Sequence, residues 1–198
     1  PTDLVEKARQ RTITPDLSSH APVILGVDVA RFGDDQSVIC QRQGLSVKPL
    51  KKFRGLDTMT LSSLVAQEIT RLNAAACFVD VVGIGAGVVD RLRQLGFDNI
   101  IEVNNGSRAE DDKKYFNKRA EWWGRVKDWL DLADIPNDDE LQDDLTAVEY
   151  GFDPRERIKL ERKEDMKDRG LASPDCGESL ALTFAQKVTT TEGRLEEV

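Results

Sequence analysis

Residues 23–39 read VILGVDVARFGDDQSVI, and this stretch decides the fold because it places an acid inside an apolar strand. The nearly continuous apolar run from Val23 to Val29 is typical of a strand that is covered on both faces. A buried carboxylate without a partner costs several kcal/mol, so Asp28 is expected to pair with a cation or to bind a metal ion. The alternative is that Asp28 only caps the turn at residues 30–33.

A second apolar strand, residues 75–82, repeats this pattern with Asp80. It follows a segment with helical spacing that starts at Asp57 or Thr58, and a strand reached through a crossover helix usually lies parallel to its neighbour. Asp28 and Asp80 would then lie at the same end of the sheet, where α/β proteins form their sites. Two carboxylates that converge repel each other, and a shared proton or a divalent cation relieves the repulsion.

A pair of acids opens the last predicted helix. Ser173 is expected as its N-cap and Pro174 at its first position, so Asp175 and Glu178 project from one face near the helix N-terminus. Asp175 could merely complement the helix dipole. Together with the two strand acids, however, it completes the set of carboxylates that a two-metal nuclease uses.

The other segments predict a single α/β domain with a mixed sheet, in which an antiparallel meander is followed by parallel strands. We expect residues 1–21 to form a linker or arm, residues 22–190 the domain, and residues 191–198 a C-terminal tail. The acidic helix that ends near Asp144 is expected to be solvated. Further elements are expected as strands at residues 37–42, 45–54 and 99–103, an aromatic helix at 118–133, and a β-hairpin formed by 146–152 and 157–161.

Composition limits the function classes. The net charge of the 198 residues is −8, but the acids are concentrated, with seven acids and no base between Asp131 and Asp144, so a basic groove on an acidic body is possible. Cys40 and Cys77 are expected as core thiols, because three distant cysteines form neither a disulfide framework nor a zinc site. No apolar stretch approaches the roughly 18 residues of a membrane span, and we expect a cytoplasmic protein.

Glycines at positions 83, 85 and 87 suggest a dinucleotide-binding loop, but the pattern is incomplete. The third glycine of that motif would be at Val88, and the segment follows the fourth strand rather than the first. We therefore rank a dinucleotide-binding protein last, and interpret the glycines as allowing a substrate backbone to approach Asp80. A phosphate-binding Walker sequence is absent, so this chain does not encode an ATPase motor.

Four segments together resemble a known family, the C-terminal nuclease domain of the large terminase subunit of tailed bacteriophages, which has a ribonuclease H-like fold. They read GVDVARFGDD, VDVVGIGAGVVDRL, YFNKRAEWW and RGLASPDCGESLALTFA. The resemblance implies that Asp28, Asp80 and Asp175 hold two divalent ions, Mg²⁺ or Mn²⁺, for in-line hydrolysis of duplex DNA. Related sequences often read SPD, then two small residues, then Asp-Ala-Leu. This chain instead has Glu178 and Ser179 at the corresponding place, so either Asp175 or Glu178 could be the direct metal ligand.

Other residues are given supporting roles on the same basis. Asp35 could support the metal site from outside the ligand set or brace its turn. The only histidine, His20, lies in the expected linker, which argues against histidine-based hydrolysis. Non-specific DNA affinity comes from cations that contact phosphates, and the candidates are Lys163, Lys167, Arg169 and Arg119.

The resemblance also implies partners and a location. We expect an ATPase motor domain before Pro1 in the same full-length protein, and double-stranded DNA, the portal ring and the small terminase subunit as partners in the host cytoplasm. Two alternatives remain open. One is a Holliday-junction resolvase-like nuclease that uses the same acids on branched DNA, and the other is a non-catalytic DNA-binding or scaffolding module of the same fold.

Overall fold

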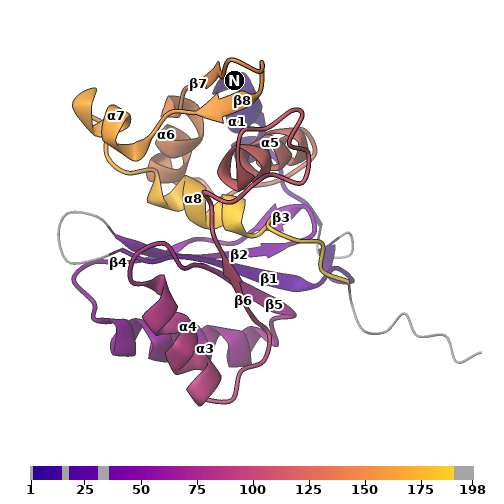
Figure 1. Cartoon of the computed structure of the whole chain (residues 1–198). Coiled ribbons are helices and arrows are strands. Elements are labelled where there is room, and N and C mark those ends of the chain that lie inside the picture. Colours follow the sequence, from indigo (N-terminus) through magenta and orange to yellow (C-terminus); the bar gives the residue numbers. More distant parts are fainter. Residues whose placement is uncertain (1, 15–17, 31–35, 190–198) are drawn as a thin grey trace, which may run out of the picture.

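A mixed β-sheet lies between two groups of helices in the computed structural model, which describes residues 2–14, 18–30 and 36–189 (Figure 1). The strand order is β3-β2-β1-β5-β6, and β4 also pairs with β2. Strands β2, β3 and β4 form the antiparallel part, whereas β1, β5 and β6 are parallel, as the sequence predicts. The strands are β1 (Val23–Asp28), β2 (Ser37–Gln43), β3 (Ser46–Val47), β4 (Lys51–Phe53), β5 (Ala76–Asp80) and β6 (Ile100–Val103).

Helices α3 (Thr58–Leu72) and α4 (Gly85–Gln94) cover one face of the sheet. Asp57 is the N-cap of α3, because its carboxylate accepts a hydrogen bond of 2.8 Å from the Thr60 amide. The core on this side contains the odd-numbered side chains of β1 and β5 and the apolar stripes of both helices. Its members include Leu25, Val27, Cys77, Val79, Val65, Ile69, Val88 and Leu92.

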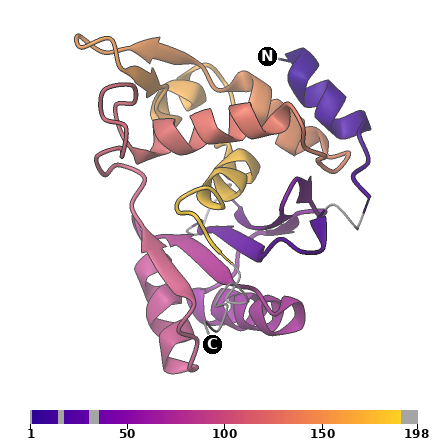
Figure 2. The same ribbon diagram turned by 90° about the vertical axis from the view of Figure 1, so that its right-hand side faces the viewer.

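The opposite face is covered first by α8 (Asp175–Leu182), which lies directly on β1 and β2 (Figure 2). Helices α5 (Lys118–Leu130) and α6 (Asp139–Ala147) pack on α8 from outside. Figure 2 shows this upper layer completed by further elements. They are α1 (Thr2–Gln10), the hairpin of β7 (Tyr150–Phe152) and β8 (Ile158–Leu160), and α7 (Lys163–Asp168).

A packed helix lies within the segment that we expected to be a linker or arm. Helix α1 packs on α5 and α6, with Val5 and Ala8 buried in the same core cluster as the tryptophans of α5. The Ile135 amide donates to the Ala8 carbonyl at 3.1 Å, and Arg9 pairs with Asp139 at 2.9 Å. Two apolar residues three apart give a short helix one buried face, and this weak signal is lost in an otherwise polar segment.

Gly26 explains how closely α8 approaches the sheet. A Cβ atom at position 26 would lie 2.0 Å from the backbone carbonyl oxygen of Ser179, a distance that no side chain tolerates. Only glycine therefore lets the backbone of α8 lie on β1. This contact fixes the height of α8 above the strand that ends in Asp28.

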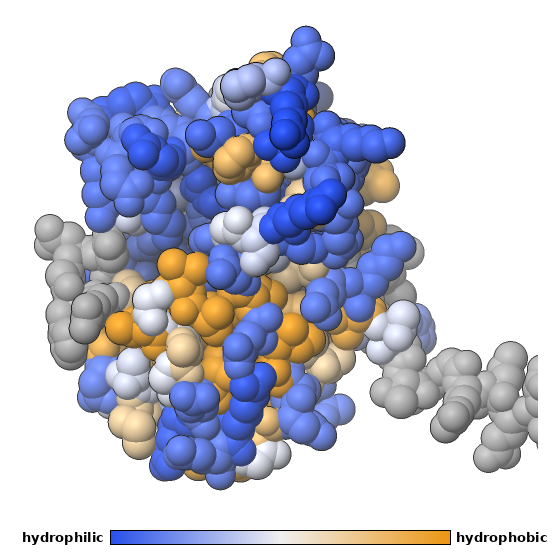
Figure 3. Space-filling model, viewed as in Figure 1, coloured by the Kyte–Doolittle hydropathy of each residue, from blue (hydrophilic) through white to orange (hydrophobic). Residues whose placement is uncertain are grey.

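The surface differs between the two layers. Figure 3 shows apolar atoms gathered at the level of the sheet and α4, whereas the upper layer is mostly hydrophilic. All three cysteines are buried and unbridged, so Cys40 and Cys77 are core thiols as expected. No helix within the described residues has the length and apolar character needed to cross a membrane.

Candidate active site

Strand geometry brings Asp28 and Asp80 together. Side chains alternate between the faces of a sheet, and Ile24 on β1 and Phe78 on β5 belong to the core on the α8 side. Asp28 and Asp80 follow these residues by an even number of positions, so both point toward α8. The parallel register pairs Val27 with Val79, which places the two acids side by side at the strand ends.

Asp28 lies deepest of the strand acids, with 8% of its surface exposed. The ammonium of Lys163, at the start of α7, is 3.5 Å from its Oδ2 atom. Burial raises the pKa of Asp28, Lys163 opposes this, and the negative charge of Glu178 adds to it. Asp28 is therefore a buried acid paired with a cation, one of the two states expected from the sequence.

Asp80 is held by two donors. The Val82 amide donates to Oδ1 at 3.1 Å, and the side-chain amide of Asn105 donates to Oδ2 at 2.8 Å. Burial raises the pKa of Asp80 to about 6, and the charges of Asp28 and Glu178 contribute. Sequence reasoning missed Asn105, because it belongs to an aperiodic loop and contacts Asp80 only through the path of that loop.

Asp175 opens α8 on the side of Asp28. Its Oδ2 atom accepts a hydrogen bond of 3.1 Å from the Gln36 amide, and its Oδ1 atom lies 3.8 Å from the Lys163 ammonium. Lys163 therefore lies between Asp28 and Asp175. Burial alone would lower the pKa of Lys163, but the charges of Asp28, Glu178 and Asp175 raise it overall.

Glu178 pairs with a different cation from Asp175. The guanidinium of Arg119 donates to it through Nε at 2.6 Å, and both side chains are at least nine-tenths buried. Arg119 also donates through Nη1 to the backbone carbonyl of Glu161 at 2.6 Å. These contacts hold Glu178 toward α5, while Asp175 faces Lys163.

The donor set fits a hard divalent cation. Carboxylate oxygens are the ligands that Mg²⁺ and Mn²⁺ prefer, and Asp28, Asp80 and Asp175 supply them from three separate elements. Burial raises the pKa values of Asp28 and Asp80, and the Lys163 ammonium lies beside Asp28, so a positive charge at this place favours the ionised carboxylates. Within the described ranges, the side chains do not form a ready-made group of three or more metal-ligating residues.

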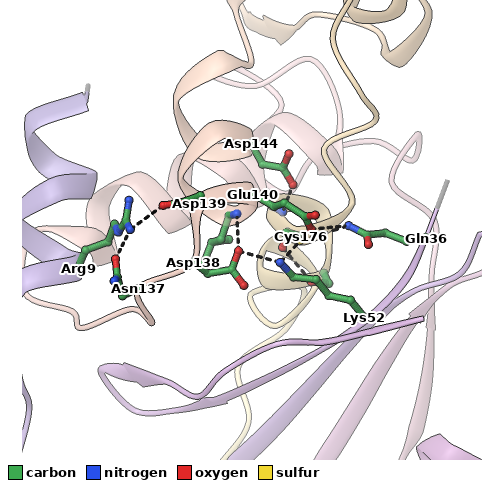
Figure 4. Close-up of polar contacts among 12 residues, drawn as sticks. Arg9, Gln36, Lys52, Asn137, Asp138, Asp139, Glu140, Asp144 and Cys176 are labelled. Carbon is green, nitrogen blue, oxygen red and sulfur yellow. Dashed lines mark hydrogen bonds and ion pairs between the residues drawn. The ribbon is translucent and has the colours of Figure 1, made fainter. Parts of the chain in front are cut away.

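Hydrogen bonds and ion pairs connect the start of α6 with the N-terminus of α8 (Figure 4). The side chain of Gln36 donates to Glu140 at 3.0 Å, while its backbone holds Asp175. Lys52 of β4 pairs with Glu140 at 2.9 Å and with Asp138 at 2.7 Å. The sheet and α6 are thereby connected to Asp175 through Gln36.

Asp144 is the clearest residue that sequence reasoning missed. We expected the acidic helix near it to be solvated, but Asp144 points to α8 and its Oδ2 atom accepts a hydrogen bond of 3.0 Å from the Gly177 amide. Burial raises the pKa of Asp144 to about 7, the amides of Gly177 and Cys176 oppose this, and the charges of Asp175 and Glu178 add to it. A signal exists in the sequence, since Asp144 lies three residues after the buried Leu141 and shares its helix face.

Gly85 is required by the packing of the chain itself. A Cβ atom there would lie 1.8 Å from the backbone carbonyl oxygen of Asp80. The approach of a substrate backbone along this glycine motif stays a prediction. Gly83 has a φ of 90°, which glycine adopts without strain. At Gly87 nothing lies within 4 Å of such an atom. Gly85 therefore allows α4 to start directly at the end of β5.

Solved structures with the same architecture include two phage nuclease domains. That of the large terminase subunit gp2 of bacterial virus Sf6 matches with a TM-score of 0.80 and 15% identity over 96% of this chain and 98% of that chain. A mutant of that domain with manganese and beta-thujaplicinol gives 0.83 and 16% over the same shares. The large terminase nuclease from thermophilic phage G20c with bound magnesium gives 0.64 and 16% over 84% and 82%.

The chain has the fold of these terminase nuclease domains. This confirms the fold class expected from the sequence. A scan of protein-family models and a search of curated protein sequences find no match.

On this terminase nuclease fold, the four candidate phosphate contacts occupy different settings. Lys163 faces the carboxylates, and Arg119 is buried against Glu178. Arg169 is exposed but pairs with Glu161 at 2.7 Å and with Glu149 at 3.1 Å. Lys167 is exposed on α7. Asp35, the expected supporting acid, lies outside the described residues, and all these roles stay predictions.

Proposed function

We propose that this chain is a metal-dependent endonuclease domain that cuts duplex DNA concatemers during viral genome packaging. Two observations support this most directly on a terminase nuclease fold: Asp28 and Asp80 end the adjacent strands β1 and β5, and the Lys163 ammonium lies between Asp28 and Asp175 of α8. These three carboxylates would hold two divalent ions, Mg²⁺ or Mn²⁺. Bound ions of this kind activate water and stabilise the leaving 3′-oxygen of a phosphodiester.

The chain's own residues have defined tasks in this proposal. Val82 and Asn105 orient Asp80 through its two oxygens, and Gln36 orients Asp175. Lys163 keeps a positive charge between Asp28 and Asp175 when the divalent ions are absent. Glu178 is engaged by Arg119, so we assign the direct ligand role to Asp175 and an electrostatic role to Glu178.

Plasmid cleavage tests this function. Wild-type protein is incubated with supercoiled plasmid in Mg²⁺, Mn²⁺ or EDTA, beside Asp28→Asn and Asp80→Asn, which remove a charge and keep the side-chain volume. Asp98→Asn is the control, because Asp98 is exposed and outside the cluster. We expect linearisation that requires the divalent ion and is lost in both site variants but not in the control. Cleavage that survives both substitutions would refute the assignment of these acids.

A four-way junction and a linear duplex, used as further substrates for cleavage and binding, separate the alternatives. A resolvase-like enzyme would cut a four-way junction symmetrically and leave a linear duplex intact. A non-catalytic module would bind duplex DNA without cutting it in either ion. The partners we propose are the ATPase motor domain of the same full-length protein, the portal and the small terminase subunit, and the proposed location is the host cytoplasm.

A further inference from the structure

The residue at the N-cap position of α8 does not cap the helix with its side chain. Residue 174, at the N-cap position, is a proline and makes no side-chain hydrogen bond to the helix. This differs from the expectation that Ser173 would be the N-cap. Because the first amides of a helix have no intrahelical partners, another acceptor must satisfy them. This end of α8 contains Asp175 and Glu178. The hydrogen bonds that hold the first turn of α8 therefore also set the positions of these two acids relative to Asp28 and Asp80.

A side chain from a different helix supplies the acceptor. Asp144 of α6 accepts a hydrogen bond of 3.0 Å from the Gly177 amide. An N-cap side chain makes this contact within its own helix, whereas here it comes from a neighbouring helix of the same chain. The contact is tight, since a Cβ atom at Gly177 would lie 3.2 Å from the Cβ of Asp144 and 2.6 Å from the ring of Trp123. Gly177 lies between the two acids of α8 in sequence, one residue before Glu178.

The arrangement has an electrostatic cost that needs a reason. Asp144 is half-buried and lies near two other acids, and burial together with the charges of Asp175 and Glu178 raises its pKa to about 7. A serine or asparagine would cap the helix without this repulsion. What the Gly177 amide requires is an acceptor oxygen, which aspartate supplies here and asparagine would also supply.

We propose that Asp144 is a positioning residue of the nuclease site, which fixes the first turn of α8 and thereby sets Asp175 and Glu178 over Asp28. This inference rests on the proposed function. It adds a fifth acid to Asp28, Asp80, Asp175 and Glu178, one that contacts no substrate or ion and acts only through the α8 backbone. Residues that orient metal ligands typically affect metal affinity or activity by about 10- to 100-fold.

Three variants of the purified chain test the proposal. Asp144→Ala removes the acceptor, Asp144→Asn keeps an acceptor oxygen without the charge, and Asp143→Ala is the matched control at an exposed neighbouring position of α6. Far-UV circular dichroism and thermal unfolding first set a temperature at which all variants are folded. Amide exchange of Gly177 is then measured by NMR without metal, and the Mn²⁺ concentration for half-maximal plasmid cleavage and the Mn²⁺ dissociation constant are measured separately.

In Asp144→Ala we expect faster exchange at Gly177 and an Mn²⁺ requirement raised by about tenfold or more. Asp144→Asn should restore both readouts to within about threefold of wild type, because asparagine is as good a cap as aspartate. Asp143→Ala should change neither. An unchanged Mn²⁺ requirement in Asp144→Ala, or an Asn variant that behaves like the Ala variant, would overturn the positioning role.

Failure of the proposed function looks different. In that case wild-type protein itself neither binds Mn²⁺ nor cleaves DNA, and the positioning role falls with the function. The exchange rates of the metal-free variants then show only whether Asp144 caps α8. The two failures are therefore distinguished by the behaviour of the wild type.

Discussion

The Nε atom of Arg119 lies 2.6 Å from the Glu178 carboxylate in a pair that is almost completely buried. The two acids of α8 thus differ in their partners, although they are only three residues apart. Glu178 is neutralised by a cation from α5, whereas Asp175 faces the ammonium of Lys163 on the side of Asp28. This difference favours Asp175 as the residue that meets a metal ion.

Breaking this pair should destabilise the domain strongly. Arg119→Met leaves the charge of Glu178 buried without a partner, and such changes cost about 3–5 kcal/mol. The double variant Arg119→Met, Glu178→Leu removes both charges and should recover most of that loss. Urea denaturation of the two variants and wild type measures the free energies of unfolding. A double variant that is less stable than Arg119→Met alone would contradict the argument.

Removing the cation between the acids should increase the dependence on divalent ions. Lys163→Met leaves Asp28 and Asp175 without their shared ammonium, so metal-free protein should lose about 1–2 kcal/mol at neutral pH, allowing for the partial exposure of Lys163. Mn²⁺ should then raise the melting temperature more in the variant than in wild type, because the ion replaces the lost charge. Thermal unfolding in EDTA and in Mn²⁺ checks this. Lys127→Met is the exposed control.

Two glycines of the same helix should respond oppositely to alanine. Gly85→Ala places a methyl group 1.8 Å from the Asp80 carbonyl oxygen, so β5 and α4 must separate and both stability and cleavage should fall. Gly87→Ala meets nothing within 4 Å and should stabilise the domain by about 0.5–1 kcal/mol, since it removes backbone freedom from the unfolded chain. Equal changes in melting temperature for the two variants would show that steric clashes do not distinguish the two positions.

Asp144 should make stability depend on pH. Its pKa rises from 3.8 to about 7 on folding, so the folded state holds the proton more tightly than the unfolded chain. The stability from this group is complete below about pH 4 and is lost as the pH rises through 7. Asp144→Asn does not titrate and should show a shallower decline between about pH 4 and 7.

The decline should not vanish in that variant, because burial also raises the pKa values of Asp28 and Asp80. Urea denaturation across this pH range measures the slopes, with Asp143→Asn as the control. Equal slopes in wild type and Asp144→Asn would show that folding does not raise the pKa of Asp144.

The sequence predicted the parts of the site that depend on local pattern. Asp28 and Asp80 stand out because each interrupts an apolar strand, and the helix from Thr58 to Leu72 between the strands makes them parallel. Their convergence follows from these facts through the right-handed crossover rule. Asp175 and Glu178 were recognisable from a proline-marked helix start.

Other contacts could not be predicted in this way. Asn105 contacts Asp80 only because of the path that an aperiodic loop takes. Lys163 contacts Asp28 from a short helix that lies 135 positions later in the sequence. Asp144 looks like one of many acids on a charged helix until α6 is seen to cross the start of α8. Helix α1 lies in a segment that is polar apart from a few residues.

The sequence by itself therefore determined the mixed sheet and the two strand acids, because side-chain alternation and helix periodicity are short-range properties of the chain. Only the tertiary structure decided that Lys163 lies between Asp28 and Asp175, that Arg119 pairs with Glu178 and that Asp144 accepts the Gly177 amide of α8. The physical reason is that these pairings depend on the relative positions of whole helices. Those positions are set by packing of the complete core, down to the absence of a side chain at Gly26.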